Sequence, residues 1–323
     1  MTTQIEWANE HWEPVGGCTD EGPACANCYA RERQLPRLVT GLTGRKSRPA
    51  VKTRLKRYSG LVKKAPMGAA RNYQWTGKLV LWPDRLVAPL RWRRSRGRVF
   101  VCSQSDLFHE LRPLSHIAAV LSVMAHCWET TFLVLTKRVA RMHEVISDAW
   151  HGSDCGELSE ALRDENPFLA RAIQSWRNPT GTPPNIWLGV SVSNQVEADE
   201  KIPVLLRTPA AKRFISYEPA LGPLTLQYER GWLEPFQDTD PFLRPTARLD
   251  WVIAGAESTH GKRPGRPARV NWFRSVRDEC ALTRTPFFLK QMATGIVLPS
   301  GKTEQRIVGT PELDGQQWTE VPQ

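Results

Sequence analysis

Three of the seven cysteines lie within eleven residues near the start of the chain. Cys18, Cys25 and Cys28 follow the pattern C-x6-C-x2-C, and no other two cysteines are nearly so close in sequence. Two cysteines three residues apart on a helical turn share one face, so both sulfurs can reach one metal centre. Gly22 and Pro23 supply turn chemistry that lets the intervening loop fold back. The pattern therefore predicts a metal-ligand loop.

Three thiolates can serve more than one kind of metal site. On a [4Fe-4S] cluster they leave one iron without a protein ligand, open to a substrate or cofactor. A structural zinc site needs a fourth ligand; the nearest candidate is His11, which would complete a Cys3His set. A disulfide is disfavoured by the odd number of cysteines and by the lack of a signal peptide, because cytosolic thiols stay reduced. The cysteine spacing alone leaves cluster and zinc both open.

Composition predicts a folded cytoplasmic protein. The chain has 323 residues, of which 41% are hydrophobic, as is normal for a packed core. The first residues have no basic stretch followed by an apolar run, so they do not resemble a secretory signal. The longest weakly polar run, His116 to Trp128, is far too short to cross a membrane. We therefore expect no membrane association.

The positive charge is concentrated in one part of the chain. Between Arg31 and Arg98 there are 20 Lys and Arg against two acidic residues, a net charge of +18, whereas the whole chain carries +11. A basic segment of this size can neutralise phosphates of a nucleic acid, and the aromatic residues among the charges can stack on bases. It can also be a solvated insertion that keeps the protein soluble. We expect nucleic-acid contact through Arg31–Arg98.

Alternating apolar runs and amphipathic stretches indicate the fold class. Each apolar run is typical of a strand buried on both faces of a parallel sheet. With a first strand over Ile5–Trp12, the pattern predicts an α/β fold, a TIM-barrel-like parallel (β/α) barrel of six to eight strands. The further expected strands are 78–81, 99–102, 131–135, 186–190, 214–216, 251–254 and 286–289; the expected helices are 25–39, 84–91, 114–127, 137–149, 195–206 and 268–282.

This pattern also suggests how the chain is divided. Residues 1–39 form a first βα unit that carries the cysteine loop, and residues 40–77, rich in Gly, Pro and basic residues, form a basic insertion. Residues 78–298 form the remainder of the barrel, with a long loop or small helical insertion over 152–184, and residues 299–323 a polar, peripheral tail.

Polar and ionisable side chains follow most of the expected strands. In a parallel barrel the carboxyl ends of the strands meet at one mouth, where active sites lie. Capping of the next helix explains Ser103, Ser191 and Asn194 as well as catalysis does, but a half-buried charge needs a partner or a ligand. The residues expected to hold a cofactor or substrate are Ser103, Asp106, Lys137, Ser191, Asn194, Glu218 and Glu257.

These motifs together resemble the phage-associated three-cysteine-motif proteins, a family of unknown function related to radical S-adenosylmethionine enzymes. The resemblance runs in order from Ile5 to Gln291. It is carried by Ile5-Glu6-Trp7, Trp12 to Cys18, Cys25 to Ala30, Ser105 to His109, Leu135 to Arg138, Gly189 to Val192, Glu218-Pro219, Ala254 to Ser258 and Phe288 to Gln291. The family usually has Asn where Glu13 stands and Gly where Ala256 stands, and C-x6-C-x2-C departs from the C-x3-C-x2-C of most radical enzymes of this type.

The resemblance implies a barrel with a [4Fe-4S] cluster on Cys18, Cys25 and Cys28 and S-adenosylmethionine bound at the open iron. It also implies a protein partner encoded nearby. Two hypotheses follow. The first is a radical S-adenosylmethionine-like enzyme that modifies or repairs a nucleic acid or nucleotide. The second is a non-catalytic protein that binds nucleic acid or protein and carries a structural Cys3His zinc site.

Overall fold

The computed structural model describes most of the chain. The described residues are 5–37, 56–67, 69, 72–92, 94–151, 182–228, 230–234, 247–258, 265–292, 296–297, 303–304 and 311–323. Residues 40–55 of the expected basic insertion and nearly all of the expected insertion at 152–184 lie outside this set.

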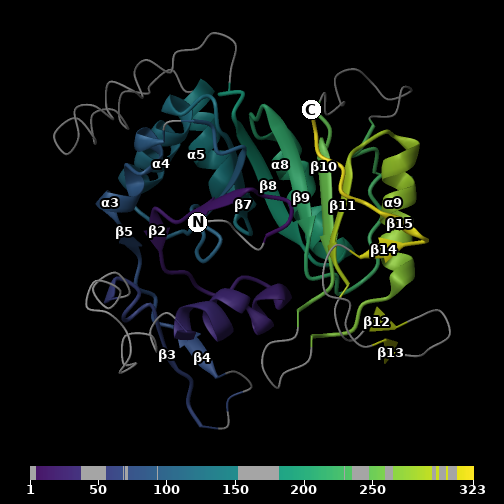
Figure 1. The fold of residues 1–323 in the computed structure, drawn as a ribbon, viewed down its shortest axis with the longest axis horizontal. Coiled ribbons are helices and arrows are strands. Elements are labelled where there is room, and N and C mark those ends of the chain that lie inside the picture. Colours follow the sequence, from purple (N-terminus) through teal and green to yellow (C-terminus); the bar gives the residue numbers. More distant parts are fainter. Residues whose placement is uncertain are drawn as a thin grey trace.

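One parallel sheet of seven strands organises the described residues. Its strands follow chain order, β1-β6-β7-β8-β9-β10-β11, and every neighbouring pair is parallel. Their bounds are Glu10–Trp12, Arg98–Val101, Thr131–Thr136, Ile186–Val192, Lys212–Tyr217, Trp251–Gly255 and Phe287–Gln291. The helices that connect the strands are α4 (Leu114–His126), α5 (Val139–His151), α8 (Gln195–Arg207) and α9 (Val270–Leu282). A sheet wound in one direction, with its helices on one face, is half of a barrel (Figure 1).

The sheet curls but does not close. β1 and β11 are its two edges and do not pair with each other. The prediction of a TIM-like α/β fold is therefore correct at the level of class and connectivity, whereas closure is not observed. One reason is that the segment expected as a strand at 78–81 does not join the sheet. Its strand β5 (Val80–Leu81) instead pairs antiparallel with β2 (Val15–Gly16) in a separate two-stranded ribbon.

Two cores pack against the two faces of the sheet. The larger joins one face to the helices, through residues such as Ile117 of α4 and Leu188 of β8. The smaller fills the concave face with aromatic rings. Trp7 contacts Phe100 and Trp251 there, with ring centroids 4.6 and 6.2 Å apart respectively. These rings fill the concave face, which leaves the carboxyl ends of the strands as the place for a cavity.

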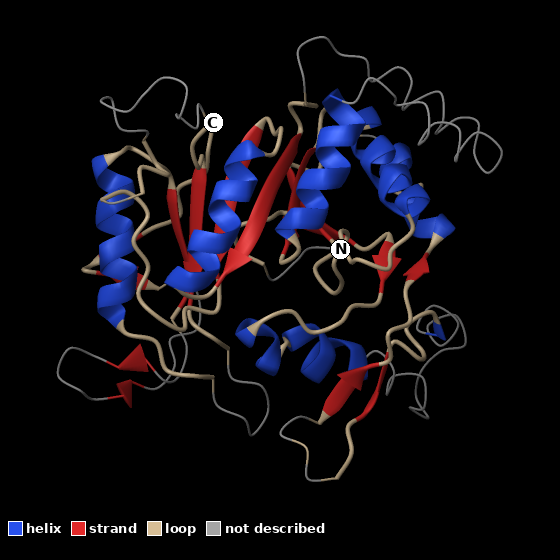
Figure 2. Ribbon diagram, turned by 180° about the vertical axis from the view of Figure 1, so that it is seen from behind, coloured by secondary structure: helices blue, strands red, loops and turns tan. Residues whose placement is uncertain are grey.

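The cysteine loop lies across those carboxyl ends. In Figure 2 the arrowheads of the sheet point toward the helical turns of residues 23–37. A single helix over 25–39 is not observed. A 3-10 turn, η1 (Pro23–Asn27), is followed by a break at Cys28 and by a π-helical segment, η2 (Ala30–Gln34). The expectation that Cys25 and Cys28 share a regular helical turn is therefore wrong, because Cys28 has extended backbone angles (φ −53°, ψ 116°).

The remaining elements are short. The stretch expected as a helix at 84–91 is one helical turn, α3 (Pro83–Leu86), and a 3-10 turn, η3 (Pro89–Arg91). Four strands form small ribbons: β3 (Val62–Lys64) with β4 (Tyr73–Trp75), and β12 (Ile296–Val297) with β13 (Thr303–Glu304). No helix among the described residues is long and apolar enough to cross a membrane.

The end of the chain covers one edge of the sheet. After the ribbon β14 (Glu312–Leu313) and β15 (Gln316–Gln317), the amide of Leu289 in β11 donates to the carbonyl of Trp318 (2.8 Å). The amide of Glu320 in turn donates to the carbonyl of Phe287 (3.1 Å). These bonds satisfy backbone groups that an open sheet would otherwise expose at its edge.

Candidate functional site

A cavity of about 270 Å³ opens at the carboxyl ends of the strands. It is lined by all three clustered cysteines and by residues at the carboxyl ends of six successive strands, β6 to β11. Of the residues expected at the site, the cavity walls contain Cys18, Cys25, Cys28, Ser103, Asp106, Lys137, Ser191, Glu218 and Glu257. Asn194 does not line it. Its side chain accepts a hydrogen bond from the amide of Glu197 (3.0 Å) and caps α8.

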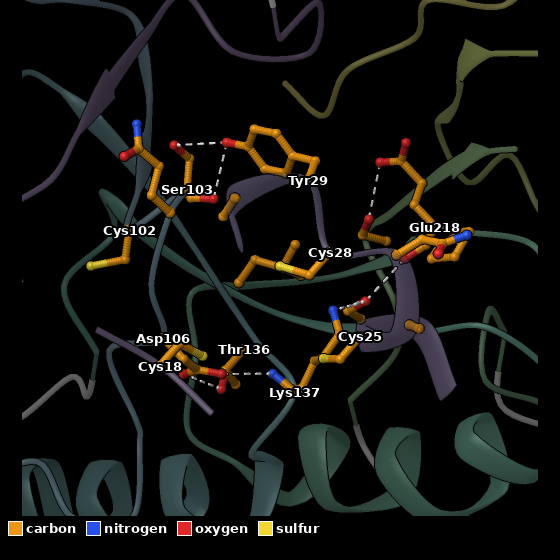
Figure 3. A pocket seen from close by; sticks show the side chains of 18 of the residues that line it. Cys18, Cys25, Cys28, Tyr29, Cys102, Ser103, Asp106, Thr136, Lys137 and Glu218 are labelled. Atoms are coloured by element: carbon orange, nitrogen blue, oxygen red, sulfur yellow. Dashed lines mark hydrogen bonds between the residues drawn. The ribbon is translucent and has the colours of Figure 1, made fainter. Parts of the chain in front are cut away.

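The three sulfurs line this cavity (Figure 3). The thiol of Cys18 donates to the carbonyl of Thr19 (3.2 Å), and the thiol of Cys25 donates to the carbonyl of Glu21 (3.1 Å). Burial, with the nearby carboxylate of Asp106, raises the pKa of Cys18 to about 12 and outweighs the opposing Arg138. Burial also raises the pKa of Cys28. Metal binding would therefore have to displace these protons.

The described side chains do not form a metal-ligand set as they stand. In the part of the chain that the structure describes, no three His, Cys, Asp or Glu side chains are arranged to hold an ion. Two of the thiols are turned to carbonyls of their own loop, so ligation requires rotation of these side chains. His11, the expected fourth zinc ligand, is not among the residues that line the cavity. In this arrangement the three described thiols therefore line one cavity without forming a ligand set.

Arg138 anchors the first part of the cysteine loop, and its side chain is almost fully buried. Its guanidinium donates to the carboxylate of Asp106 (3.1 Å), to the hydroxyl of Thr19 (2.8 Å) and to the sulfur of Cys18 (3.8 Å). Asp106 also accepts from the hydroxyl of Thr136 (2.7 Å). Since these donors occupy the Asp106 carboxylate, its place at the site is to hold the loop rather than to contact a ligand.

A second buried carboxylate anchors the other part of the loop. Glu257 accepts from the side-chain amide of Asn27 (2.7 Å), and Arg266 pairs with it through two nitrogens, at 2.9 and 2.5 Å. Arg266 also donates to the carbonyl of Pro23 (3.0 Å). Burial alone would raise the pKa of Glu257, but the hydrogen bonds from Arg266 and Asn27 outweigh it and hold the pKa below its usual value. Glu257 is thus an ionised anchor.

Other polar groups of the cavity remain available to a ligand. The ammonium of Lys137 donates to the hydroxyl of Ser191 (3.0 Å), and in the described residues no carboxylate pairs with it. Glu218 pairs with Lys290 (2.8 Å) and accepts from the hydroxyl of Ser216 (3.1 Å). A half-buried cation that is satisfied only by a hydroxyl favours an anionic ligand.

Glu13 lies behind the cavity wall and was not expected as a site residue. Its carboxyl group accepts from the hydroxyl of Ser103 (2.5 Å) and from the amide of Gln104 (3.3 Å). Tyr29 in turn donates to the carbonyl of Ser103 (3.1 Å). Burial raises the pKa of Glu13 to about 7, although the hydrogen bonds from Ser103 and Gln104 oppose the change. Glu13 is therefore partly protonated near neutral pH.

The basic segment does not present all of its charges to solvent. The side chain of Arg31 is fully buried, where it pairs with Asp20 and Glu32. Arg57 pairs with Asp84 (2.9 Å). Lys63 and Lys64 are exposed on the β3–β4 ribbon, whose Trp75 lines the cavity wall.

The residues that sequence reasoning missed are mainly the partners of those it found. Arg138 follows Lys137 directly, so a second charge at the same strand end was the available signal. Asn27 lies between two of the cysteines, but nothing local connects it or Arg266 to Glu257.

Comparison with known proteins gives a family and no function. A family model described as "Protein of unknown function (DUF5131)" matches residues 2–322. No curated protein and no solved structure matches the chain.

Proposed function

This chain belongs to the family of proteins of unknown function DUF5131, and we propose that it is an iron–sulfur enzyme of the radical S-adenosylmethionine type that acts on a nucleic acid or a nucleotide. The resemblance to phage-associated three-cysteine-motif proteins supports the proposal and suggests a partner protein encoded nearby. A cytoplasmic location would keep the three thiols reduced.

One observation carries the proposal. Cys18, Cys25 and Cys28 line one cavity, and His11, the expected fourth ligand, does not line it. Three sulfur ligands suit a [4Fe-4S] cluster with one iron free. The chemistry that such a cluster supplies when bound is one-electron reduction of S-adenosylmethionine at the free iron.

The surrounding residues would divide the remaining work. Asp106 with Arg138, and Glu257 with Asn27, would hold the two parts of the cysteine loop at fixed positions. The ammonium of Lys137 would bind a carboxylate or phosphate of the ligand in the cavity. The paired charges of Glu218 and Lys290 can donate to and accept from its neutral polar groups.

The substrate class is inferred from what surrounds the cavity. Lys63 and Lys64 are exposed on the ribbon that also contributes Trp75 to the cavity wall. Ammonium groups on the same ribbon as an indole of the cavity wall can hold phosphates while the indole stacks on a base. A nucleic acid or nucleotide would therefore match both this ribbon and the ammonium of Lys137.

The proposal is tested by turnover. Protein purified without oxygen and reconstituted with iron and sulfide should cleave S-adenosylmethionine when a strong reductant is added. The C28A variant should lose this cleavage and retain the melting behaviour of the sheet. Cleavage that survives in C28A, or a colourless protein that holds zinc and cleaves nothing, would overturn the proposal in favour of a structural zinc site.

A further inference from the structure

A second concave surface lies at the amino ends of the strands, whereas the cysteine cavity opens at their carboxyl ends. β6 runs from Arg98 to Val101, and Cys102, which follows it, lines the cysteine cavity. Beside the beginning of this strand lie two cavities of about 270 and 480 Å³, which share Arg94 and Ser95 in their walls. We call this surface the arginine pocket; it is lined chiefly by Arg91, Arg94, Arg96, Trp92, His126 and Trp128.

The arginine pocket has an excess of positive charge. Arg91 and Arg94 are exposed, and neither pairs with a carboxylate of the described residues. Arg96 lies 3.8 Å from Glu10, close to the longest separation of an ion pair, and Glu10 is not in the walls of the pocket. Glu129 is the one acidic residue among the described walls. Three guanidinium groups against one carboxylate leave the pocket cationic.

The aromatic side chains of the pocket differ in their freedom. Trp92 is fixed, since it stacks on Phe132 (16° between the rings) and lies under the guanidinium of Arg96, 5.6 Å from the ring centroid. Trp128 is 72% exposed, the largest aromatic side chain so exposed among the described residues. An exposed indole beside cationic groups offers a flat apolar face, and no aromatic ring of the described residues stacks on it.

We propose that the arginine pocket binds a single-stranded segment of nucleic acid, with Arg91 and Arg94 on its phosphates and Trp128 stacked on a base. The larger of the two cavities, of about 480 Å³, already lies within the roughly 300–1,000 Å³ of ordinary ligand sites, enough for a nucleotide unit. Base faces are hidden inside a duplex, whereas an unpaired base presents its face to an indole. This favours a single strand over a duplex, and the aromatic contact favours a nucleic acid over an acidic protein.

This inference does not depend on cluster chemistry. The arginine pocket lies at the amino ends of the β-strands. A nucleic acid bound there would therefore be held apart from the cysteine cavity, which lies at their carboxyl ends. Binding can therefore be measured on the full chain whether or not it carries a metal. A protein that does not cleave S-adenosylmethionine could still bind nucleic acid at the arginine pocket.

The test compares variants in their affinity for a labelled oligothymidylate of about 12 nucleotides, by fluorescence anisotropy over a range of salt. R91Q/R94Q should weaken binding about tenfold and reduce the salt slope by about 1.4, because each phosphate contact contributes roughly 0.7 for single strands. W128A should weaken binding about fivefold or more. The matched control is R207Q/R284Q. It alters two exposed arginines near the amino ends of other strands, and it should change neither the affinity nor the salt slope.

Three results would overturn the proposal. The first is a change in R91Q/R94Q no larger than in the control. The second is an unchanged affinity for the oligothymidylate in W128A. The third is a polyglutamate that competes as well as the oligonucleotide, since it would assign the pocket to an acidic protein. All variants alter exposed side chains, so their melting temperatures should match that of the unsubstituted protein.

Discussion

The side-chain amide of Asn27 donates a 2.7 Å hydrogen bond to the carboxylate of Glu257, a residue 230 positions away. This bond joins the cysteine loop to the carboxyl end of β10. The guanidinium of Arg266 donates two hydrogen bonds to the same carboxylate. The position of Cys28, next to Asn27, therefore depends on a strand near the other end of the chain.

Breaking this anchor should loosen the cysteine loop. In E257Q the charge that Arg266 pairs with is removed, and we expect a loss of about 1–3 kcal/mol of unfolding free energy together with poorer retention of iron. Urea unfolding and iron content measure the two effects. The control is D314N, which weakens the pairs of the half-exposed Asp314 with Arg274 and Arg277 and should cost about 1 kcal/mol or less without loss of iron. Equal effects in the two variants would deny Glu257 its role as an anchor.

Arg138 should matter more than a surface cation. R138Q leaves the Asp106 carboxylate buried without its charge partner, which typically costs about 3–5 kcal/mol. The double variant R138Q/D106N removes both charges, so its stability should recover part of that loss. A double-mutant cycle from urea unfolding measures the coupling between the two residues. Additive losses would show that the two side chains do not act as a pair.

Glu13 predicts a pH dependence of stability. Its pKa is raised to about 7 in the folded chain from an ordinary value of 4.5, so the folded state binds the proton more tightly than the unfolded state. The contribution of Glu13 is therefore greatest at acid pH and is lost as the pH rises through about 7, by at most about 3 kcal/mol. E13Q mimics the protonated form, so it should be more stable than the unsubstituted protein near pH 8 and not near pH 5.

Thermal or urea unfolding at the two pH values tests this, with the exposed Glu312 changed to Gln as the control. A stability gain of E13Q that is the same at both pH values would contradict the assignment of a protonated Glu13.

Lys137 should determine the affinity for anions in the cysteine cavity. K137M keeps much of the side-chain volume and removes the ammonium that donates to Ser191. A charge-assisted hydrogen bond contributes about 1.5–3 kcal/mol, so the affinity of reconstituted protein for S-adenosylmethionine should fall about 10- to 150-fold. Calorimetric titration measures it, with K56M, at an exposed lysine that does not line the cavity, as the control. An unchanged affinity of K137M for S-adenosylmethionine would show that Lys137 does not bind the carboxylate of this ligand.

The fold could be predicted from sequence where the pattern is local. The helix expected at 114–127 corresponds to α4, and the strand expected at 131–135 corresponds to β7, because each carries its own hydrophobic period. The run at 78–81 has the same apolar character, yet β5 pairs with β2 outside the main sheet. Strand partners and barrel closure depend on contacts between distant segments, which a short apolar run does not encode.

The candidate site divides in the same way. In a parallel sheet the residues at the carboxyl ends of the strands lie close together. This rule was enough to predict that Asp106, Lys137 and Glu218 share one cavity with the cysteines. It could not separate anchors from residues that remain available to a ligand, because that distinction rests on hydrogen bonds between residues far apart in sequence. Arg138 and Arg266 already neutralise the carboxylates of Asp106 and Glu257, whereas Lys137 donates to the hydroxyl of Ser191 and pairs with no carboxylate of the described residues.

The central claim is that Cys18, Cys25 and Cys28 hold a cluster with one iron free. Iron and acid-labile sulfide analysis of protein purified without oxygen, combined with Mössbauer spectroscopy, tests it most directly. We expect about four irons and four sulfides per chain, and one iron in four whose signal changes when S-adenosylmethionine is added. One zinc per chain with four protein ligands, or four irons that ignore S-adenosylmethionine, would contradict it.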